Sequence, residues 1–393
     1  MLTGTSAIYP IARKSSILSI PSNPMRILAQ EVPVPKQGTA ESGPCRPERT
    51  VMRGAPKILL PMLCLLAAGL SACSESDSST TSGISTLPQP QVVGEWKSKI
   101  GESIESLAIH DGAIYAVSGY DGVLVFRMSV SNTPEKATNF LTNTRVRSIL
   151  LSASEKPALL YAVGSDKNNN SVLQAYSLAD PFDPELVYSS SNLPGSFPNS
   201  LALSGTSVYL GDEFNGLMEF DRITNPPQLR EKRRMGIGGV RLRAIAVDTD
   251  RKMAAVAAEE DGVIMVDLVS GKIAGRASNP LSMACTIQIS NRFVAVGDRM
   301  NGIILYDMTK PDQPLILGSY STAGEAMDIR LNNKELTVSD GGNGLVHLDI
   351  SGPKNISNTW RFSCPGITYQ SVQVSNLVFM ACGADGMRII RIP

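Results

Sequence analysis

The stretch Asn301-Gly-Ile-Ile-Leu-Tyr-Asp307, followed by Pro311-Asp-Gln-Pro314, decides the fold of this 393-residue chain. It joins a tight polar turn to a run of apolar residues and then to a proline-rich link. Asn-Gly and Asp-Gly tolerate the positive φ angles that tight hairpin turns require. The same turn and strand recur every 40 to 49 residues, at positions 122, 171, 216, 262, 302, 344 and 386, with serine in place of glycine at 171. A repeat of this length with β-strand patterning is typical of a propeller blade.

The two ends of the repeat region indicate how the blades close into a ring. Each unit contains four strand-like segments, but the chain ends at Pro393, directly after the third segment of its last unit. The missing segment stands at the other end, since Gln91-Val-Val-Gly-Glu-Trp96 is similar to Pro314-Leu-Ile-Leu-Gly-Ser-Tyr320. Pairing this strand with the last unit removes two exposed edges. We therefore predict an all-β fold, a monomeric seven-bladed β-propeller of four-stranded blades over residues 92–393.

The repeat unit resembles the LVIVD repeat of bacterial and archaeal extracellular proteins. The shared pattern is a turn of Asp or Asn with Gly, an apolar strand that ends in Asp, and a short link to Pro-x-x-Pro. Its most complete copy covers 301–314, whereas the second unit lacks the glycine and the fourth, at Val269-Ser-Gly-Lys272, lacks the prolines. The resemblance implies a β-propeller at the cell surface or in the envelope. It implies no established reaction and no catalytic residues.

The segment ahead of the repeats has the pattern of a bacterial lipoprotein signal peptide. The basic stretch Met52-Arg-Gly-Ala-Pro-Lys57 runs into the apolar residues 58–70, which have the length of a signal-peptide core rather than of a membrane span. Leu70-Ser-Ala-Cys73 is similar to the lipobox of these proteins. This resemblance implies cleavage before Cys73, attachment of a diacylglyceryl group to it and acylation of the new amino terminus, for example with palmitate. Two or more acyl chains anchor a protein stably.

These features divide the chain into four regions. Residues 1–51 have no periodic pattern and precede a complete signal peptide, so we interpret them as a non-native upstream extension. Residues 52–72 form the signal peptide, residues 73–91 a flexible tether rich in Ser and Pro, and residues 92–393 the propeller. Ser74, rather than Asp, follows the lipidated cysteine, which resembles the pattern sorted to the outer membrane of Gram-negative bacteria. We therefore expect a lipid-anchored protein of the bacterial envelope, at the outer membrane.

The composition argues against several functional classes. The chain carries 36 basic and 36 acidic residues, so no net charge favours binding to nucleic acid. Its two histidines, His110 and His347, stand in different units, which excludes a three-histidine zinc site. No Gly-x-Ser-x-Gly motif supports a catalytic triad. We accordingly expect no cofactor, no metal and no catalytic residue, and a protein that is not an enzyme.

One face of the predicted propeller gathers carboxylates. The turns between second and third strands share this face with the links between blades, and seven of their residues form a candidate ligand face: Asp121, Asp212, Glu259, Asp261, Asp298, Asp340 and Asp385. A ring of carboxylates suits a cation or a basic partner. The alternative is that turn geometry and solvation favour these residues without any ligand.

The innermost strands align into a column of small residues at the crowded centre: Ser106, Ser148, Ser200, Ala244, Thr286, Asp328 and Ser371. Asp328 is an exception in this column, as is Arg330 two residues further on. The two are candidates for an ion pair that lines the central channel, or for one edge of a ligand site. The structural pair is the favoured interpretation, because propeller channels are often merely filled with water.

Cys364 and Cys382 are candidates for a disulfide within the last blade, because envelope compartments are oxidising. Their offset across the predicted hairpin is not ideal for a bridge, and spacing alone does not determine connectivity.

An anchor, a tether and a rigid platform without a catalytic constellation favour a binding or scaffold role. We expect the propeller to present its loop-rich face to a protein or glycan partner. One alternative is a propeller hydrolase of the lactonase or glycosidase kind that uses carboxylates of that face. Another is a scaffold for outer-membrane assembly.

Overall fold

The computed structural model describes residues 89–393, apart from 100, 192, 194–196, 225–226, 278–282, 291–292 and 300. The predicted upstream extension, the signal peptide, the lipidation site Cys73 and the tether up to residue 88 lie outside the described residues. Among the residues described, no helix is long and apolar enough to cross a membrane.

Seven four-stranded antiparallel sheets make up the described chain, and each sheet is one blade. In blades 1 to 6 the strands follow one another from the inner to the outer edge. Blade 1 contains β2 (Ile104–His110), β3 (Ala113–Ser118), β4 (Val123–Met128) and β5 (Pro134–Phe140), with the 3-10 helix η1 (Gly119–Asp121) in its central turn. Blade 2 contains β6 (Thr144–Ser152), β7 (Leu159–Asp166), β8 (Ser171–Ser177) and β9 (Glu185–Ser191). Blade 3 contains β10 (Pro198–Ser204), β11 (Ser207–Asp212), β12 (Gly216–Thr224) and β13 (Pro227–Met235).

The remaining blades repeat this order, except that the last takes its outer strand from the start of the described chain. Blade 4 contains β14 (Ala244–Asp248), β15 (Met253–Ala257), β16 (Val263–Asp267) and β17 (Lys272–Ala277). Blade 5 contains β18 (Ala284–Ser290), β19 (Phe293–Asp298), β20 (Gly302–Asp307) and β21 (Leu315–Tyr320). Blade 6 contains β22 (Asp328–Asn332), β23 (Glu335–Ser339), β24 (Leu345–Asp349) and β25 (Ser357–Phe362). Blade 7 contains β26 (Gln370–Val374), β27 (Leu377–Ala381), β28 (Met387–Arg391) and β1 (Gln91–Trp96).

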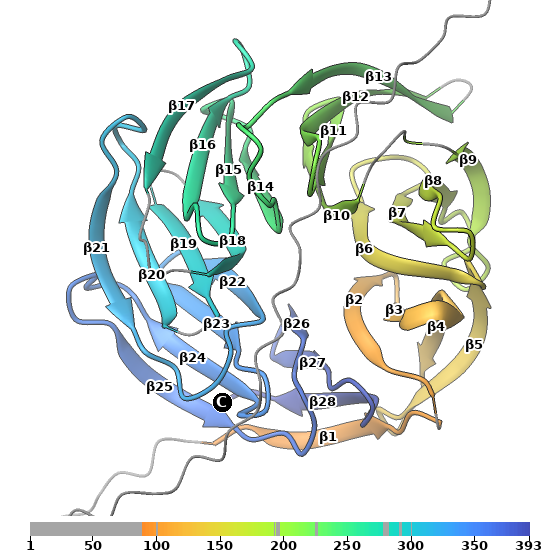
Figure 1. Ribbon diagram of the computed structural model, residues 1–393. Helices are drawn as coiled ribbons and strands as arrows, with labels where there is room; N and C mark the ends of the chain where they lie inside the picture. The colour runs from red at the N-terminus through yellow and green to blue at the C-terminus, as the bar shows by residue number, and fades with distance from the viewer. Residues whose placement is uncertain are drawn as a thin grey trace, which may run out of the picture. The chain divides into compact units, whose positions relative to one another are not determined.

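The seven blades form a closed ring, as Figure 1 shows with the inner strands facing the centre. Each inner strand contacts the inner strand of the next blade, and β26 of blade 7 contacts β2 of blade 1. β1 pairs antiparallel with β28, from Gln91 opposite Arg391 to Trp96 opposite Met387. The prediction of a seven-bladed propeller closed by the N-terminal strand is therefore confirmed.

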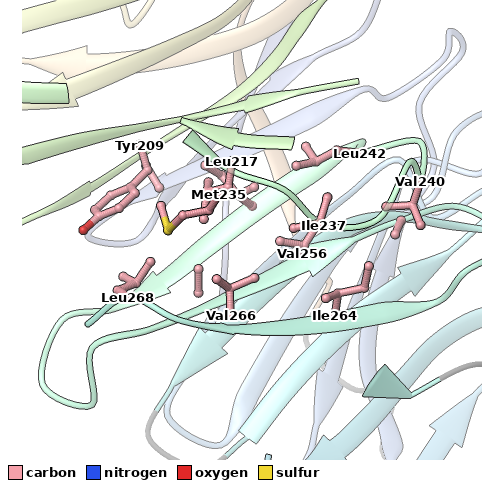
Figure 2. Close-up of a cluster of buried hydrophobic side chains, with 14 residues drawn as sticks. Tyr209, Leu217, Met235, Ile237, Val240, Leu242, Val256, Ile264, Val266 and Leu268 are labelled. Atoms are coloured by element: carbon pink, nitrogen blue, oxygen red, sulfur yellow. The ribbon is translucent and has the colours of Figure 1, made fainter. Parts of the chain in front are cut away.

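The hydrophobic core lies between the blades rather than within one of them, because both faces of each sheet are covered by neighbouring sheets. Each of the seven clusters of buried apolar side chains joins two successive blades. Figure 2 shows the cluster between blades 3 and 4, where Tyr209 and Leu217 meet Val256, Ile264 and Val266. Burial of such side chains stabilises by roughly 1.5–3 kcal/mol each. The cluster between blades 6 and 7 is the smallest of the seven.

The ring has two unlike faces. One face carries the turns between second and third strands together with the links from one blade to the next, and we call it the loop face. The turn face, on the opposite side, carries the turns from inner to second strands and from third to outer strands. These names are used below for all seven blades.

The turn glycines have a steric role beyond their positive φ. A Cβ at Gly302 would lie 2.3 Å from the carbonyl oxygen of Tyr320, and one at Gly344 would lie 2.0 Å from that of Phe362. In both blades the carbonyl belongs to the last residue of the outer strand. Gly386 of blade 7 is packed in the same way against Trp96, with 2.1 Å to its oxygen. The glycine therefore lets the outer strand end close against the central turn.

Candidate functional site

The predicted carboxylates all lie on the turns of the loop face, but they do not form one site. Asp212, Asp298 and Asp340 are fully buried. Asp121, Asp261 and Asp385 are exposed at the tips of their turns. Glu259 forms ion pairs with Arg243 and, at 3.8 Å, with Arg241. Within the described part of the chain, no three His, Cys, Asp or Glu side chains come together as metal ligands.

The buried aspartates hold the loops in place. Asp212 Oδ1 accepts hydrogen bonds from the backbone N–H groups of Phe214 (3.0 Å) and Asn215 (2.7 Å). Asp298 Oδ2 accepts from Met283 N at 3.2 Å, and Asp340 Oδ2 accepts from Gly324 N at 3.0 Å. The last two bonds tie the central turn of a blade to the link that leads into it. These hydrogen bonds favour the turn-geometry interpretation of the carboxylates.

In blade 7 a pair of cysteines replaces this carboxylate anchor. Cys382 stands four residues before the turn glycine Gly386, as Asp340 stands four before Gly344. The link into blade 6 supplies Thr322, whose hydroxyl group hydrogen-bonds to Asp340, and the link into blade 7 supplies Cys364 at the matching place. Both cysteines are buried free thiols, with their sulfur atoms 2.9 Å apart. The predicted pair is thus brought into contact.

The pKa values of the two thiols are shifted in opposite directions. The hydrogen bond with Cys382 lowers the pKa of Cys364 to about 6, although burial acts in the opposite direction. The pKa of Cys382 is raised by the same hydrogen bond and by burial. Because a thiolate is the form that attacks a disulfide, Cys364 is the more reactive member of the pair.

Asp328 ties blade 6 to blade 7. It accepts a hydrogen bond from the backbone N–H of Ser371, the second residue of the next inner strand. The same tie recurs where Ser200 Oγ accepts from Ile245 N at 3.1 Å. Gln370 Oε1 likewise accepts from the backbone N–H of Leu107 in blade 1. Burial raises the pKa of Asp328, and the Arg330 guanidinium works against that rise.

The predicted column of small residues is wrong by one position in blade 7. Gln370 pairs with Ala381, and Asp328 pairs with Ser339, and both partners stand five residues before a turn glycine. Gln370, rather than Ser371, is therefore the counterpart of Asp328, and Ser371 is buried. The short apolar strand offers two registers with equally plausible alternation, and only the pairing decides between them.

Arg330 forms an ion pair with Asp328, as predicted, and also lines a cavity. Its Nε lies 2.9 Å from Asp328 Oδ2, close enough for charge attraction but not aligned as a hydrogen bond. Two-fifths of the Arg330 side chain is exposed. Arg330 also lines a cavity of about 420 Å³ between blades 6 and 7, which we call the interblade cavity. It is lined by Arg330, Asn332, Glu335, Thr337, His347, Ser371, Val372, Gln373, Ser375 and Val378.

An aromatic patch on the loop face was not predicted from the sequence. Phe197, at the entry to blade 3, and Phe214, in its central turn, are 42% and 62% exposed. Their rings meet edge to face with centroids 5.5 Å apart, and the Arg147 guanidinium lies 5.1 Å from the Phe197 ring. We call these three residues the aromatic patch. Apolar residues in the turn sequences were the available signal, since turns are ordinarily polar.

Hydrogen bonds fix the backbone beneath the aromatic patch. Asp212 binds the N–H of Phe214, and the N–H of Glu213 donates to the Phe197 carbonyl at 3.0 Å. Arg147 donates from Nη1 to Asn199 Oδ1 at 3.1 Å, which holds its guanidinium at the patch. The exposed rings are therefore carried on a rigid base.

Comparison with known proteins agrees with the repeat and the architecture. The LVIVD repeat family matches residues 282–322 and 323–360, which cover blades 5 and 6. No curated protein matches the chain in sequence.

Three solved structures resemble the chain at low sequence identity. A computationally designed protein, Ika8, is 11% identical with a TM-score of 0.55, over 77% of this chain and 100% of that one. Raptor from Chaetomium thermophilum is 12% identical with a TM-score of 0.63, over 78% of this chain and 29% of that one. A chain of the mitotic checkpoint complex is 12% identical with a TM-score of 0.59, over 84% of this chain and 99% of that one. At such identities the similarity shows the fold alone.

Proposed function

Because this chain is an LVIVD-repeat β-propeller, we propose that it is a non-enzymatic binding platform tethered to a bacterial envelope membrane, whose loop face binds a protein or glycan partner. The observation that carries the proposal is the aromatic patch. Exposed aromatic side chains beside an arginine are the composition of binding hot spots. Aromatic rings also offer flat apolar surface to sugars and to apolar side chains.

The rigid base of the patch favours binding further. A partner that covers Phe197 and Phe214 removes apolar surface from water, and the rings are already held by the hydrogen bonds to Asp212 and Phe197. Hydrogen bonds that fix the backbone of Phe197 and Phe214 before binding reduce the conformational entropy lost in such an encounter. A hot-spot side chain of this kind contributes about 2 kcal/mol or more, which is roughly thirtyfold in Kd.

The direction of β1 supports presentation away from the membrane. Gln91, the first residue of β1, is paired with Arg391 at the turn face, while Trp96 reaches the loop face beside Gly386. A tether that precedes Gln91 therefore joins the domain at the turn face. If Cys73 carries the lipid, the residues from there to Gln91 reach at most roughly 60 Å when fully extended. The tether then attaches to the face opposite the one that carries the aromatic patch.

Lipidation at Cys73 is tested by metabolic labelling. Cells that express the full chain are grown with labelled palmitate, beside cells that express Cys73→Ala. We expect label on the wild-type protein and none on the variant, because the variant lacks the thiol that is modified. Label that persists on Cys73→Ala would remove the anchor from the proposal.

Photocrosslinking of the full chain in envelopes tests partner binding on the loop face. A photoreactive residue replaces Phe214, and a matched control replaces Val130, which is fully exposed in the β4–β5 turn of the turn face. We expect a discrete adduct at 214 that is lost when Phe197→Ala is added, and none at 130. Protease or glycosidase digestion of the adduct identifies the class of partner. Equal crosslinking at both positions would contradict the proposal.

The two rival functions predict other results. A hydrolase that uses loop-face carboxylates requires an exposed acid that is free to react, whereas Asp212, Asp298 and Asp340 are engaged in hydrogen bonds with the loops. Turnover of lactone or glycoside substrates that disappears in Asp261→Asn or Asp385→Asn would favour the hydrolase. A scaffold for outer-membrane assembly would instead yield integral membrane proteins as the adducts at position 214.

A further inference from the structure

The interblade cavity is a polar interruption of an otherwise apolar interface. At the second- and third-strand positions of the row of side chains across the sheet, blade 5 has Ala295 and Leu305, and blade 1 has Tyr115 and Val125. Blade 5 has Gln288 at the inner-strand position, and the polar Glu219 in the row of blade 3 is neutralised by basic side chains. The corresponding row of blade 6 contains Arg330, Thr337 and His347, which are paired across neighbouring strands. Uncompensated polar groups at a packed interface cost free energy. In blade 6 these polar side chains line a cavity, where their polar atoms are available to a ligand.

Thr337 and His347 are both 8% exposed, yet each offers an unused polar atom. Among the described residues, no hydrogen bond is formed by Thr337 Oγ1. The Thr359 hydroxyl group hydrogen-bonds with the His347 carbonyl at 3.1 Å and with His347 Nδ1 at 2.6 Å. In the tautomer in which the hydroxyl group donates to the carbonyl, Nδ1 carries the ring proton. The proton on Nδ1 leaves Nε2 as an acceptor in the neutral ring. Nε2 is 3.8 Å from Glu335, beyond hydrogen-bonding distance.

The imidazole is held in this neutral form by its surroundings. It stacks on Trp360 with ring centroids 4.8 Å apart, and burial lowers the pKa of His347, against the opposing effects of Glu335 and Asp349. At neutral pH His347 therefore carries no positive charge that could neutralise the carboxylate of Glu335. Glu335, His347 Nε2 and Thr337 Oγ1 together supply three acceptors, which is the number of N–H groups on a primary ammonium.

The opposite charge lies one strand away. Arg330 is paired with Thr337, at a strand spacing of about 5 Å. Its contact with Asp328 is made through Nε, and the two terminal nitrogens of a guanidinium suit a carboxylate bound in the cavity that Arg330 lines. The volume of about 420 Å³ lies within the range of small-molecule sites, roughly 300–1,000 Å³.

We propose that the interblade cavity binds a small zwitterion of amino-acid or dipeptide size, with its ammonium at Glu335, Thr337 and His347 and its carboxylate at Arg330. The site opens on the turn face, next to Asn332 and Ser375, and is separate from the aromatic patch. It stands whether or not the loop face binds a partner.

Isothermal titration calorimetry of the full chain with alanine and alanyl-alanine tests the proposal. N-acetylalanine lacks the ammonium and alaninamide lacks the carboxylate, so we expect each to bind at least tenfold more weakly than the corresponding zwitterion. Glu335→Gln should weaken the zwitterion at least tenfold. Gln288→Ala changes the position in blade 5 that matches Arg330, and it should leave the affinity unchanged.

Arg330 is tested by Arg330→Lys, because Arg330→Gln would leave Asp328 buried without its partner. Arg330→Lys keeps the positive charge and loses the planar fork, so it should fold with a wild-type unfolding midpoint and bind more weakly. Absence of binding by both zwitterions would overturn the proposal. Equal affinity for the neutralised analogues, or unchanged affinity in Glu335→Gln and Arg330→Lys, would overturn it as well.

Discussion

Replacing Gly386 by alanine tests how the ring is closed. Gly386 has φ +88°, and a Cβ there would lie 2.1 Å from the Trp96 carbonyl oxygen and 2.8 Å from Ser98 N. Gly112, in the turn between β2 and β3, has φ +78° but no atom within 4 Å of its would-be Cβ. The two glycines therefore share the left-handed backbone and differ in whether the outer strand is packed against them.

The losses of unfolding free energy in the two variants should differ only because the outer strand lies close to Gly386 and not to Gly112. Alanine in the left-handed region costs about 1–2 kcal/mol, which is the whole effect expected for Gly112→Ala. Gly386→Ala adds the displacement of β1, and forced overpacking costs about 1–3 kcal/mol more. We expect destabilisation of about 1 kcal/mol for Gly112→Ala and about 3 kcal/mol for Gly386→Ala.

Urea unfolding followed by tryptophan fluorescence measures both effects. The chain has two tryptophans, Trp96 in β1 and Trp360 in blade 6, so Trp360→Phe leaves Trp96 as the reporter of ring closure. Differences in midpoint at a common slope give the change in unfolding free energy. Equal destabilisation of the two variants, within about 0.5 kcal/mol, would refute the reasoning, because backbone strain alone would then explain the glycine.

Three further predictions concern a buried carboxylate, the thiol pair and the aspartates of the loop face. Glu219→Gln should destabilise by about 2 kcal/mol, since Glu219 is buried and binds Lys232 at 2.8 Å and Arg233 at 2.6 Å. Although burial opposes the shift, these hydrogen bonds lower the pKa of Glu219. Thermal melts should therefore show the wild type losing this stability as the pH falls below about 4.5, and the variant should lack that loss. Treatment with oxidised glutathione should remove two hydrogens from the Cys364–Cys382 pair, release two reduced glutathiones and stabilise the fold by about 3 kcal/mol. Thiols that stay titratable after this treatment would contradict the bridge, as would the same stabilisation in Cys382→Ser. Millimolar Ca²⁺ or Mg²⁺ should leave the Tm unchanged, because the aspartates of the loop face are separate, and a large rise would restore the cation-ring hypothesis.

The architecture could be predicted because its signals are local. The Asn-Gly turn at 301–302 and the strand after it carry the blade repeat within a few residues. The similarity of 91–96 to 314–320 indicates that 91–96 is an outer strand, and its pairing with β28 closes the ring. Such signals do not depend on which blades are neighbours.

The candidate sites depend on neighbours, which explains why they were only partly predicted. Asp212 and Asp340 stand four residues before a turn glycine and Asp261 stands directly before one, but only the structure shows that the first two are buried and hydrogen-bonded to the loops. Alternation along β23 shows that Thr337 shares a face with Glu335, but not that blade 7 leaves this face incompletely covered. Contacts across blades decide the role of each residue, and they come from segments far apart in the chain.

The pairing of β1 with β28 also determines how the domain meets mechanical force. A pull on the chain ahead of Gln91 arrives first at the pair Gln91–Arg391 and then passes along the strand towards Trp96. The first structure to detach is thus a single peripheral strand, whose loss leaves the inner three strands of blade 7 and the other six blades paired. In a tethered protein under force, blade 7 would therefore lose its outer strand before the other blades unfold.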